Sequence, residues 1–176
     1  MMSLQRVGSR VARCAAVALG FLSLQVCAEA LPENDVKAGF VLNFIRYSEG
    51  MQPIGGELRV CAVGPSPLDG KLLGLSGRGT DFGTVVVIAP SSERDWRECQ
   101  VVFVGSGDRA GPALAALSNR QVLTIGDSAG FAQAGGMIEI RLRSGRVRFA
   151  VNHGAIKHAG LRVSSQLLKL ADEVYP

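Results

Sequence analysis

Short apolar runs, each bounded by glycine, proline or polar residues, constrain the fold of this chain more than any other feature. Four of these runs are predicted to be strands, at residues 57–63, 84–89, 99–104 and 122–125. Helical spacing of apolar residues or a helix-capping residue predicts helices between or before them, at residues 34–48, 66–73 and 112–117. Runs that are apolar on both faces are typical of a parallel sheet that helices cover on both sides. The sequence therefore predicts an α/β fold.

The pattern changes in the last third of the chain. Two strand-like segments, 137–142 and 147–151, are joined by Ser144-Gly145, which is a hairpin signal. Helices are expected at 34–48 with Asn34 as N-cap, at 131–134 behind an Asp127-Ser128 cap, at 152–159 and at 164–174. We therefore predict a three-layer α/β/α domain with a mixed, mainly parallel sheet and a C-terminal antiparallel hairpin.

The N-terminus has the three blocks of a secretory signal peptide. Three arginines within the first thirteen residues precede an apolar block at 14–24, and small residues follow at Ala28 and Ala30. The apolar block is too short for a permanent membrane span. We expect cleavage after Ala30, with Ala28 as the alternative site, so residues 1–30 are the signal and residues 31–176 form a single domain in the periplasm.

Removal of the signal changes the charge of the chain. The whole chain has 19 basic and 15 acidic residues, and the signal contains three of the basic ones and one of the acidic ones. The mature chain thus has 16 basic and 14 acidic residues, a net charge of +2. No lysine and arginine run interleaved with aromatic residues accompanies this small charge, so the sequence does not predict nucleic-acid binding.

Two of the four cysteines, Cys61 and Cys99, remain after cleavage. Leu24-Gln25-Val26 before Cys27 disfavours a lipoprotein signal, in which small residues precede the lipidated cysteine. Two cysteines in an oxidising compartment most often pair, so we predict a structural disulfide. A reactive thiol pair and half of a metal site are the alternatives, and the sequence offers neither C-x-x-C spacing nor nearby histidines for them.

No motif in the sequence assembles an active site. The glycines of residues 105–111 follow a strand, but their spacing differs by one residue from the G-x-G-x-x-G fingerprint of dinucleotide-binding proteins. His153 and His158 are five residues apart and so lie on different helix faces. Ser165 has Lys169 four residues later, which does not match the S-x-x-K motif. The sequence predicts no enzyme, metal site or cofactor.

A ligand crevice is the remaining candidate site. Asn152, His153, Arg162 and Ser164 lie near the ends of the last predicted strand and the last two helices. Open α/β sheets often form ligand crevices at such places. The guanidinium of Arg162 is the sharpest candidate, because it can fork to a carboxylate or phosphate. The alternatives are a solvated loop arginine and, for the serine pair at 164–165, a helix N-cap.

Several segments together resemble the YfiR family of small periplasmic proteins. They are Val36-Lys-Ala-Gly-Phe40, Asn43-Phe44, Val122-Leu-Thr-Ile-Gly-Asp127, Phe131-Ala132, Gly135-Gly-Met-Ile138, Val147-Arg-Phe149, Asn152, Ala159-Gly-Leu161 and Ser164-Ser-Gln-Leu-Leu-Lys-Leu-Ala171. The resemblance covers nearly all of the mature chain. It also places Cys61 and Cys99 at the positions of a YfiR-type disulfide, whereas the cysteines of a second, more C-terminal disulfide are absent.

The resemblance implies a regulator. YfiR-like proteins are periplasmic repressors of a membrane-bound diguanylate cyclase, and they lower cyclic-di-GMP output and biofilm formation. Their expected partners are the periplasmic domain of that inner-membrane cyclase and an outer-membrane, OmpA-like lipoprotein that sequesters the repressor. A homodimer is also expected from the family. The alternative function is a periplasmic small-ligand-binding sensor module that uses the predicted crevice.

Overall fold

The computed structural model describes residues 32–64, 68–90, 92–105, 107 and 110–176, and the predicted export signal lies outside these ranges. The helices are α1 (Glu33–Arg46), α2 (Asp69–Leu73), α3 (Glu93–Trp96), α4 (Ala110–Leu117), α5 (His153–His158) and α6 (Ser165–Leu170). The strands are β1 (Ser48–Glu49), β2 (Glu57–Val63), β3 (Gly79–Thr80), β4 (Gly83–Ile88), β5 (Val101–Val104), β6 (Leu123–Gly126), β7 (Ile138–Arg143), β8 (Arg146–Asn152), β9 (Arg162–Val163) and β10 (Glu173–Tyr175).

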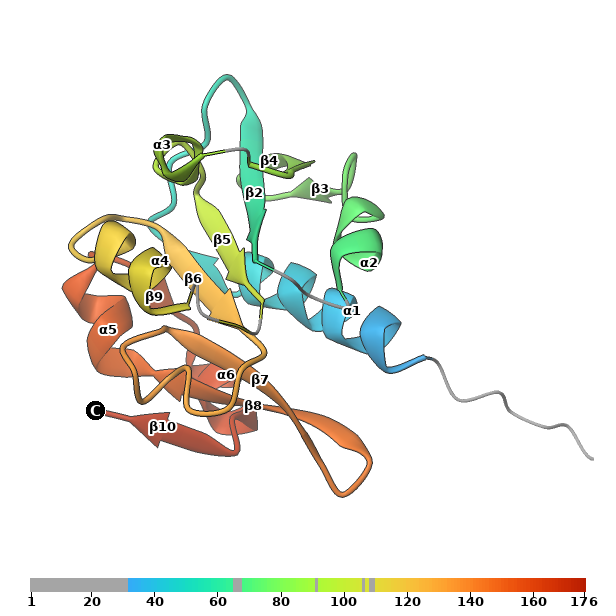
Figure 1. Ribbon diagram of the computed structural model, residues 1–176, viewed down its shortest axis with the longest axis vertical. Coiled ribbons are helices and arrows are strands. Elements are labelled where there is room, and N and C mark those ends of the chain that lie inside the picture. Colours follow the sequence, from blue (N-terminus) through green and yellow to red (C-terminus); the bar gives the residue numbers. More distant parts are fainter. Residues whose placement is uncertain (1–31, 65–67, 91, 106, 108–109) are drawn as a thin grey trace, which may run out of the picture. The chain divides into compact units, whose positions relative to one another are not determined.

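In the described part of the chain, eight strands form one mixed sheet in the order β10-β8-β7-β6-β5-β2-β4-β3 (Figure 1). The five strands from β4 to β7 in this order pair in parallel. On either side of these five strands, β3 is antiparallel to β4, and β8 is antiparallel to β7 and parallel to the edge strand β10. A separate two-stranded antiparallel sheet joins β1 to β9. The predicted mixed, mainly parallel sheet is confirmed.

The central strands form because their residues can be buried on both faces. Every residue of β5 and of β6 is buried, and both are short apolar runs. Parallel strands covered by helices on both sides have this composition. The four apolar runs recognised in the sequence are therefore the four neighbouring strands at the centre of the sheet.

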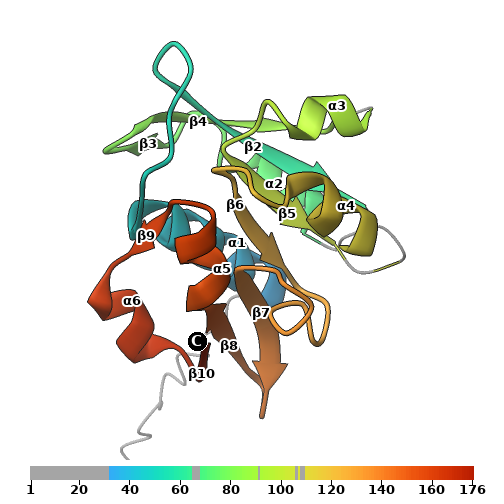
Figure 2. The ribbon, with the colours of Figure 1, turned by 90° about the vertical axis from the view of Figure 1, so that its left-hand side faces the viewer.

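Helices cover both faces of the sheet, and Figure 2 shows α1 on one side and α4 on the other. One apolar cluster packs side chains of α1, α2, α5 and α6 against the sheet, among them Val41, Phe44, Ile45, Leu72, Ile156 and Leu167. A second cluster lies on the other face with α3 and α4, and it contains Trp96, Ala113, Leu117, Cys61 and Cys99. This arrangement is the predicted three-layer α/β/α architecture.

Helix α1 begins one residue before its predicted N-cap. The N-cap is Pro32, so Asn34 lies within the first turn. Glu33 and Asp35 place negative charge at this end, where the helix dipole favours it. Glu33 also forms an ion pair of 2.7 Å with Lys37, one turn later. The first turn is therefore stabilised by acidic residues and not by an asparagine cap.

The predicted hairpin is present. Strands β7 and β8 pair antiparallel over six residues, from Ile138 opposite Val151 to Arg143 opposite Arg146. The turn residues Ser144 and Gly145 have φ of 49° and 71°. Positive φ at both central residues is the requirement of the two-residue turn that best matches the twist of a hairpin.

The C-terminal prediction was wrong in part, because the expected helix at 164–174 is a helix followed by a strand. Helix α6 ends at Leu170, and residues 173–175 form β10, which pairs in parallel with β8. The amide of Asp172 donates to the carbonyl of Phe149 at 2.9 Å and starts this pairing. The outer edge of β8 would otherwise leave backbone groups unpaired, so tertiary pairing prevails over the local helical pattern.

The short helix expected at 131–134 is a series of turns. The amide of Ala132 donates to Glu139 Oε2 at 3.1 Å, and its carbonyl accepts from Asn152 Nδ2 at 2.8 Å. These bonds to side chains replace the bonds that a helix would make. Residues 93–96, which the sequence analysis did not assign, form α3 behind a capping box of Ser92 and Asp95. The helix predicted at 66–73 has its expected N-cap, Ser66, outside the described residues, and α2 follows Leu68.

Candidate functional site

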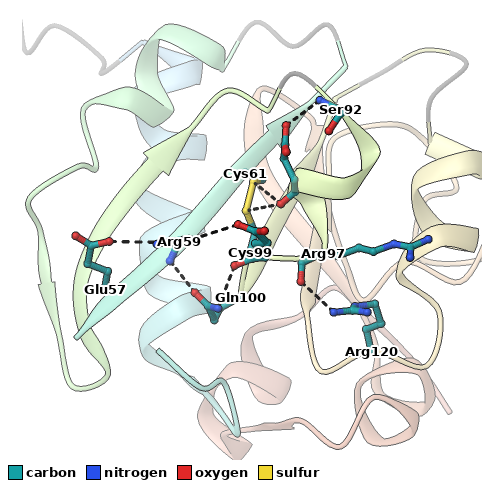
Figure 3. Close-up of a disulfide and its surroundings, with 10 residues drawn as sticks. Glu57, Arg59, Cys61, Ser92, Arg97, Cys99, Gln100 and Arg120 are labelled. Carbon is teal, nitrogen blue, oxygen red and sulfur yellow. Dashed lines mark hydrogen bonds and ion pairs between the residues drawn. A yellow bond between two sulfur atoms is a disulfide. The ribbon is translucent and has the colours of Figure 1, made fainter. Parts of the chain in front are cut away.

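The disulfide joins two neighbouring strands of the central sheet, as the sequence predicted. Cys61 lies in β2, and Cys99 lies two residues before β5 (Figure 3). Their Cα atoms are 6.0 Å apart, a usual separation for a disulfide, and the bond spans 38 residues. Closing a loop of that length stabilises the fold by about 4 kcal/mol through the entropy of the unfolded chain.

The surroundings of the disulfide are apolar and closely packed. Cys61 is fully buried and Cys99 is 3% exposed, and both belong to the cluster that contains Trp96. The two sulfur atoms lie 3.9 and 3.6 Å from the carbonyl oxygen of Asp95. A disulfide sulfur has no proton to donate, so these are packing contacts. The pair is therefore a structural disulfide within the apolar core. It is neither a reactive thiol pair nor half of a metal site, the two alternatives that the sequence left open.

Two of the four residues of the predicted crevice cap helices. Asn152 Oδ1 accepts from the amide of Ala155 at 2.8 Å at the start of α5. Ser164 Oγ accepts from the amide of Leu167 at 3.2 Å at the start of α6. These are ordinary N-cap bonds. The cap alternative weighed for the serine pair therefore applies to Ser164.

The other two crevice residues lie on different elements. Arg162 is in β9, and its Nε and Nη2 atoms both donate to Glu49 Oε2, at 3.2 and 3.1 Å. Both side chains are strongly exposed, so this pair adds little stability. His153 is half-buried at the first residue of α5. Three of the four side chains thus have partners within the chain, and ligand binding by these four residues stays a prediction.

The sheet opens where β6 meets β7. These strands pair only at Ile125 with Ile138 and at Gly126 with Glu139. One residue earlier, the side chain of Thr124 takes the place of a backbone partner, because its Oγ1 accepts from the amide of Met137 at 3.0 Å. The connecting loop, residues 127–137, is held by Thr124, Glu139 and Asn152 through their side chains.

Phe131 fixes the other side of that loop. Its ring is 2% exposed and belongs to the second apolar cluster. A Cβ atom added at Gly126 or at Gly136 would lie 2.7 or 2.1 Å from a ring carbon. Only glycine fits beside the ring at these two positions. The packing of the ring explains why glycine occupies positions 126 and 136.

A cavity of about 510 Å³ lies between α4, this loop and α5. Its apolar lining includes side chains from all three elements, among them Leu114, Leu117, Phe131, Met137 and Ala159. Its volume is within the range of small-molecule sites. None of the four residues of the predicted crevice is among the described residues that line it.

A few polar groups converge on the cavity. Thr124 and Ser128 line it from the sheet and the loop. Ser128 Oγ is buried and has no hydrogen-bond partner among the described residues. Asn119 and His158 are hydrogen-bonded to each other and also line the cavity. An apolar cavity with a few polar groups has the composition expected of a pocket for a small organic molecule.

Sequence reasoning missed this cavity because half of the described residues that line it are alanine or glycine. Alanines of α4 and α5 are ordinary helix residues, and nothing in their spacing indicates a hollow between the helices. One local signal was present, the polar Thr124 in an otherwise apolar strand. Within the described ranges, no group of three or more histidine, cysteine or acidic residues is placed to hold a metal ion.

The fold resembles solved structures of unrelated sequence. One is described as the ABC domain in complex with L-Trp from Streptococcus pneumonia, with a TM-score of 0.52 and 8% identity over 80% of this chain and 61% of that one. Another is a conserved domain protein from Vibrio cholerae, with a TM-score of 0.51 and 8% identity over 81% and 60% of the two chains. The chain thus spans about three fifths of these structures, and the likeness is one of fold.

The remaining comparisons give the family. No curated protein matches the chain. None of the helices in the described segments has the length and apolarity of a membrane span. The YfiR/HmsC-like family model matches residues 34–172, from the first turn of α1 to the residues just after α6, and the predicted resemblance is confirmed. The chain belongs to the YfiR/HmsC-like family.

Proposed function

We propose that this protein is a periplasmic signalling repressor that binds the periplasmic part of an inner-membrane diguanylate cyclase and lowers cyclic-di-GMP production. The family match over residues 34–172 carries the proposal. The buried disulfide supports export, because structural disulfides persist in oxidising compartments. We assign the protein no catalytic step. An OmpA-like lipoprotein of the outer membrane relieves repression by sequestering it, and a homodimer is the proposed assembly.

A repressor of this kind acts by preferring one state of its receptor. Converting a receptor from almost fully active to almost fully inactive requires about 5.5 kcal/mol of differential binding energy. Contact through exposed apolar side chains can supply energy of this order. The chain exposes several, namely Tyr47, Ile54, Leu73, Leu142, Leu170 and Val174.

Deletion of the gene tests the proposal in cells. We expect cyclic-di-GMP to rise when the gene is deleted and to fall again when the full chain is expressed from a plasmid. A matched control expresses residues 31–176 without the signal, which keeps the protein in the cytoplasm and is expected not to restore repression. Unchanged cyclic-di-GMP after deletion, or full repression by the leaderless chain, contradicts the proposal.

A small-ligand sensor is the second candidate, and the cavity under α4 favours it. The cavity has room for a small organic molecule, and the buried hydroxyl of Ser128 has no partner within the described residues. A ligand at a hundred times its Kd stabilises the folded state by about 2.7 kcal/mol. In a domain of this size that raises Tm by roughly 5–10 °C.

Thermal melting against a panel of small apolar and aromatic compounds tests the sensor. Leu114→Trp fills the cavity and is expected to abolish any Tm shift, and Ser128→Ala is expected to reduce it. Arg162→Ala is the matched variant for the crevice predicted from the sequence. A shift that survives Leu114→Trp but is lost in Arg162→Ala places the ligand at that crevice, and no shift with any compound contradicts the sensor.

A further inference from the structure

One face of the β7–β8 hairpin carries four arginines. In the sequence R-L-R-S-G-R-V-R at 141–148, the register pairs Arg141 with Arg148 and Arg143 with Arg146. Directly opposed residues of an antiparallel pair share a face, and so do residues two apart on one strand. All four guanidinium groups therefore leave the hairpin on the same side. Figures 1 and 2 show its tip extending beyond the rest of the sheet.

Carboxylates neutralise the two arginines nearer the body of the protein. Arg141 Nη2 donates to Glu173 Oε2 at 3.0 Å, and Arg148 lies 3.9 Å from Asp172. Burial disfavours the charge of Arg141, but the hydrogen bond to Glu173 and nearby carboxylates outweigh it and raise its pKa. Hydrogen bonds from Tyr175 and Arg141 lower the pKa of Glu173. This end of the face is a structural contact with β10.

The two arginines at the tip have no such partner. Arg143 and Arg146 are both exposed, and among the described residues neither lies within ion-pair distance of a carboxylate. Like charges directly opposed across a hairpin destabilise it. This pair therefore destabilises the hairpin, an effect offset only by a longer-range attraction between Arg143 and Glu173, and the excess positive charge is available to a partner.

We propose that the tip of this face, with Arg143 and Arg146, binds the anionic phospholipid surface of the inner membrane. A guanidinium forks to phosphate oxygens, and a lipid surface presents phosphates as a flat array that needs no complementary shape. A two-stranded ribbon whose cations leave on one side presents them together to such an array. The choice of membrane rests on the proposed periplasmic location, whereas binding itself requires no cyclase. Membrane attachment would raise the concentration of the protein near a membrane-embedded receptor.

Vesicle sedimentation with protein purified from the periplasm tests the proposal. We expect binding to phosphatidylglycerol-containing vesicles, weak binding to pure phosphatidylcholine vesicles, and loss of binding at high salt. Each arginine near an anionic surface contributes about fivefold in partitioning, so Arg143→Ala/Arg146→Ala is expected to weaken binding about 30-fold. Arg143→Lys/Arg146→Lys retains the charge and is expected to retain most of the binding.

A matched control separates the face from net charge. Arg78→Ala/Arg94→Ala removes the same charge from two exposed positions outside the hairpin and is expected to change vesicle binding much less. Thermal melting verifies the fold, and the Arg143/Arg146 alanine variant is expected to melt at the same temperature or slightly higher, since a repulsion is removed. Equal binding to both vesicle types, or equal loss in the control, overturns the proposal.

Binding to the cyclase's periplasmic domain, measured beside vesicle binding, separates failure of the membrane proposal from failure of the proposed function. If the native protein does not bind anionic vesicles but the Arg143/Arg146 alanine variant loses binding to a cyclase's periplasmic domain, the face recognises an acidic protein surface and the membrane proposal is wrong. If anionic vesicles bind the native protein and the cyclase domain does not, the membrane proposal stands and the proposed repressor function fails.

Discussion

Gly136 tests how closely the β6–β7 loop is packed. A Cβ atom at this position would lie 2.1 Å from Cε1 and 2.3 Å from Cδ1 of Phe131. Gly136 does not have a positive φ, so alanine is acceptable to its backbone and the obstacle is the ring alone. The ring is 2% exposed and cannot swing away without leaving its apolar cluster.

The size of the effect follows from the two ways in which the protein can respond. Overpacking with the ring in place costs about 1–3 kcal/mol. Expelling the ring costs as much as losing a buried phenylalanine, about 3–5 kcal/mol. We therefore expect Gly136→Ala to lower the free energy of unfolding by about 3 kcal/mol. In a Phe131→Ala background the space is already empty, and the same substitution is expected to cost almost nothing.

Urea unfolding of the four proteins of this double-mutant cycle measures the coupling, which we expect to be about 3 kcal/mol. Gly39→Ala is the matched control. Gly39 is exposed within α1 and an added Cβ meets nothing within 4 Å, so alanine there is expected to stabilise by about 0.5–1 kcal/mol. Additive costs for the two substitutions at the loop would refute the packing argument.

Three further predictions concern the disulfide, the caps and pH. Replacing Cys61 and Cys99 together by alanine is expected to lower the free energy of unfolding by about 4 kcal/mol in urea, and a loss below 1 kcal/mol would show that the loop adds little. Asn152→Ala removes a cap and one of the two hydrogen bonds to the carbonyl of Ala132, which also accepts from the amide of Gly135, so calorimetry is expected to show a loss of about 2 kcal/mol, against about 1 kcal/mol for Ser164→Ala. Because the folded-state pKa of Glu173 is lowered, its contribution to the free energy of unfolding is present above the ordinary carboxyl pKa of about 4.3 and is lost as pH falls through the lower folded value. Urea unfolding measured against pH is therefore expected to show a smaller loss of stability on the acid side in Glu173→Gln than in the native protein. An unchanged profile would contradict this assignment.

The sequence predicted the parts of the fold whose signals are local. Buried parallel strands such as β5 and β6 are continuous apolar runs, and Ser144-Gly145 is a turn with its own chemistry, so both were recognised. Two-residue strands such as β1 and β9 have no periodicity to detect. Strand β10 forms because the edge of β8 has unpaired backbone groups, a cause that lies more than twenty residues away in the chain.

The site residues divide in the same way. The disulfide between Cys61 and Cys99 was predicted because two cysteines remain after signal cleavage and the expected compartment is oxidising. Asn152 was noticed as a polar residue at a strand end, but its partner in the distant loop, the carbonyl of Ala132, is visible only in three dimensions. The cavity beside Ser128 arises from the gap between two helices and a loop, and no sequence period records such a gap. The alternation of arginines at 141–148 is visible in the sequence, but only the register of the hairpin shows that all four lie on one face.

Titration of the purified, disulfide-bonded protein into the purified periplasmic domain of its diguanylate cyclase tests the proposed function most directly. The repressor hypothesis predicts saturable binding, and it predicts that cyclic-di-GMP synthesis by the full-length cyclase in vesicles falls over the same concentration range. A cyclase lacking its periplasmic domain is expected to be unaffected. No binding up to about 1 mM, the limit at which an affinity of only about −4 kcal/mol is detected, would contradict the hypothesis.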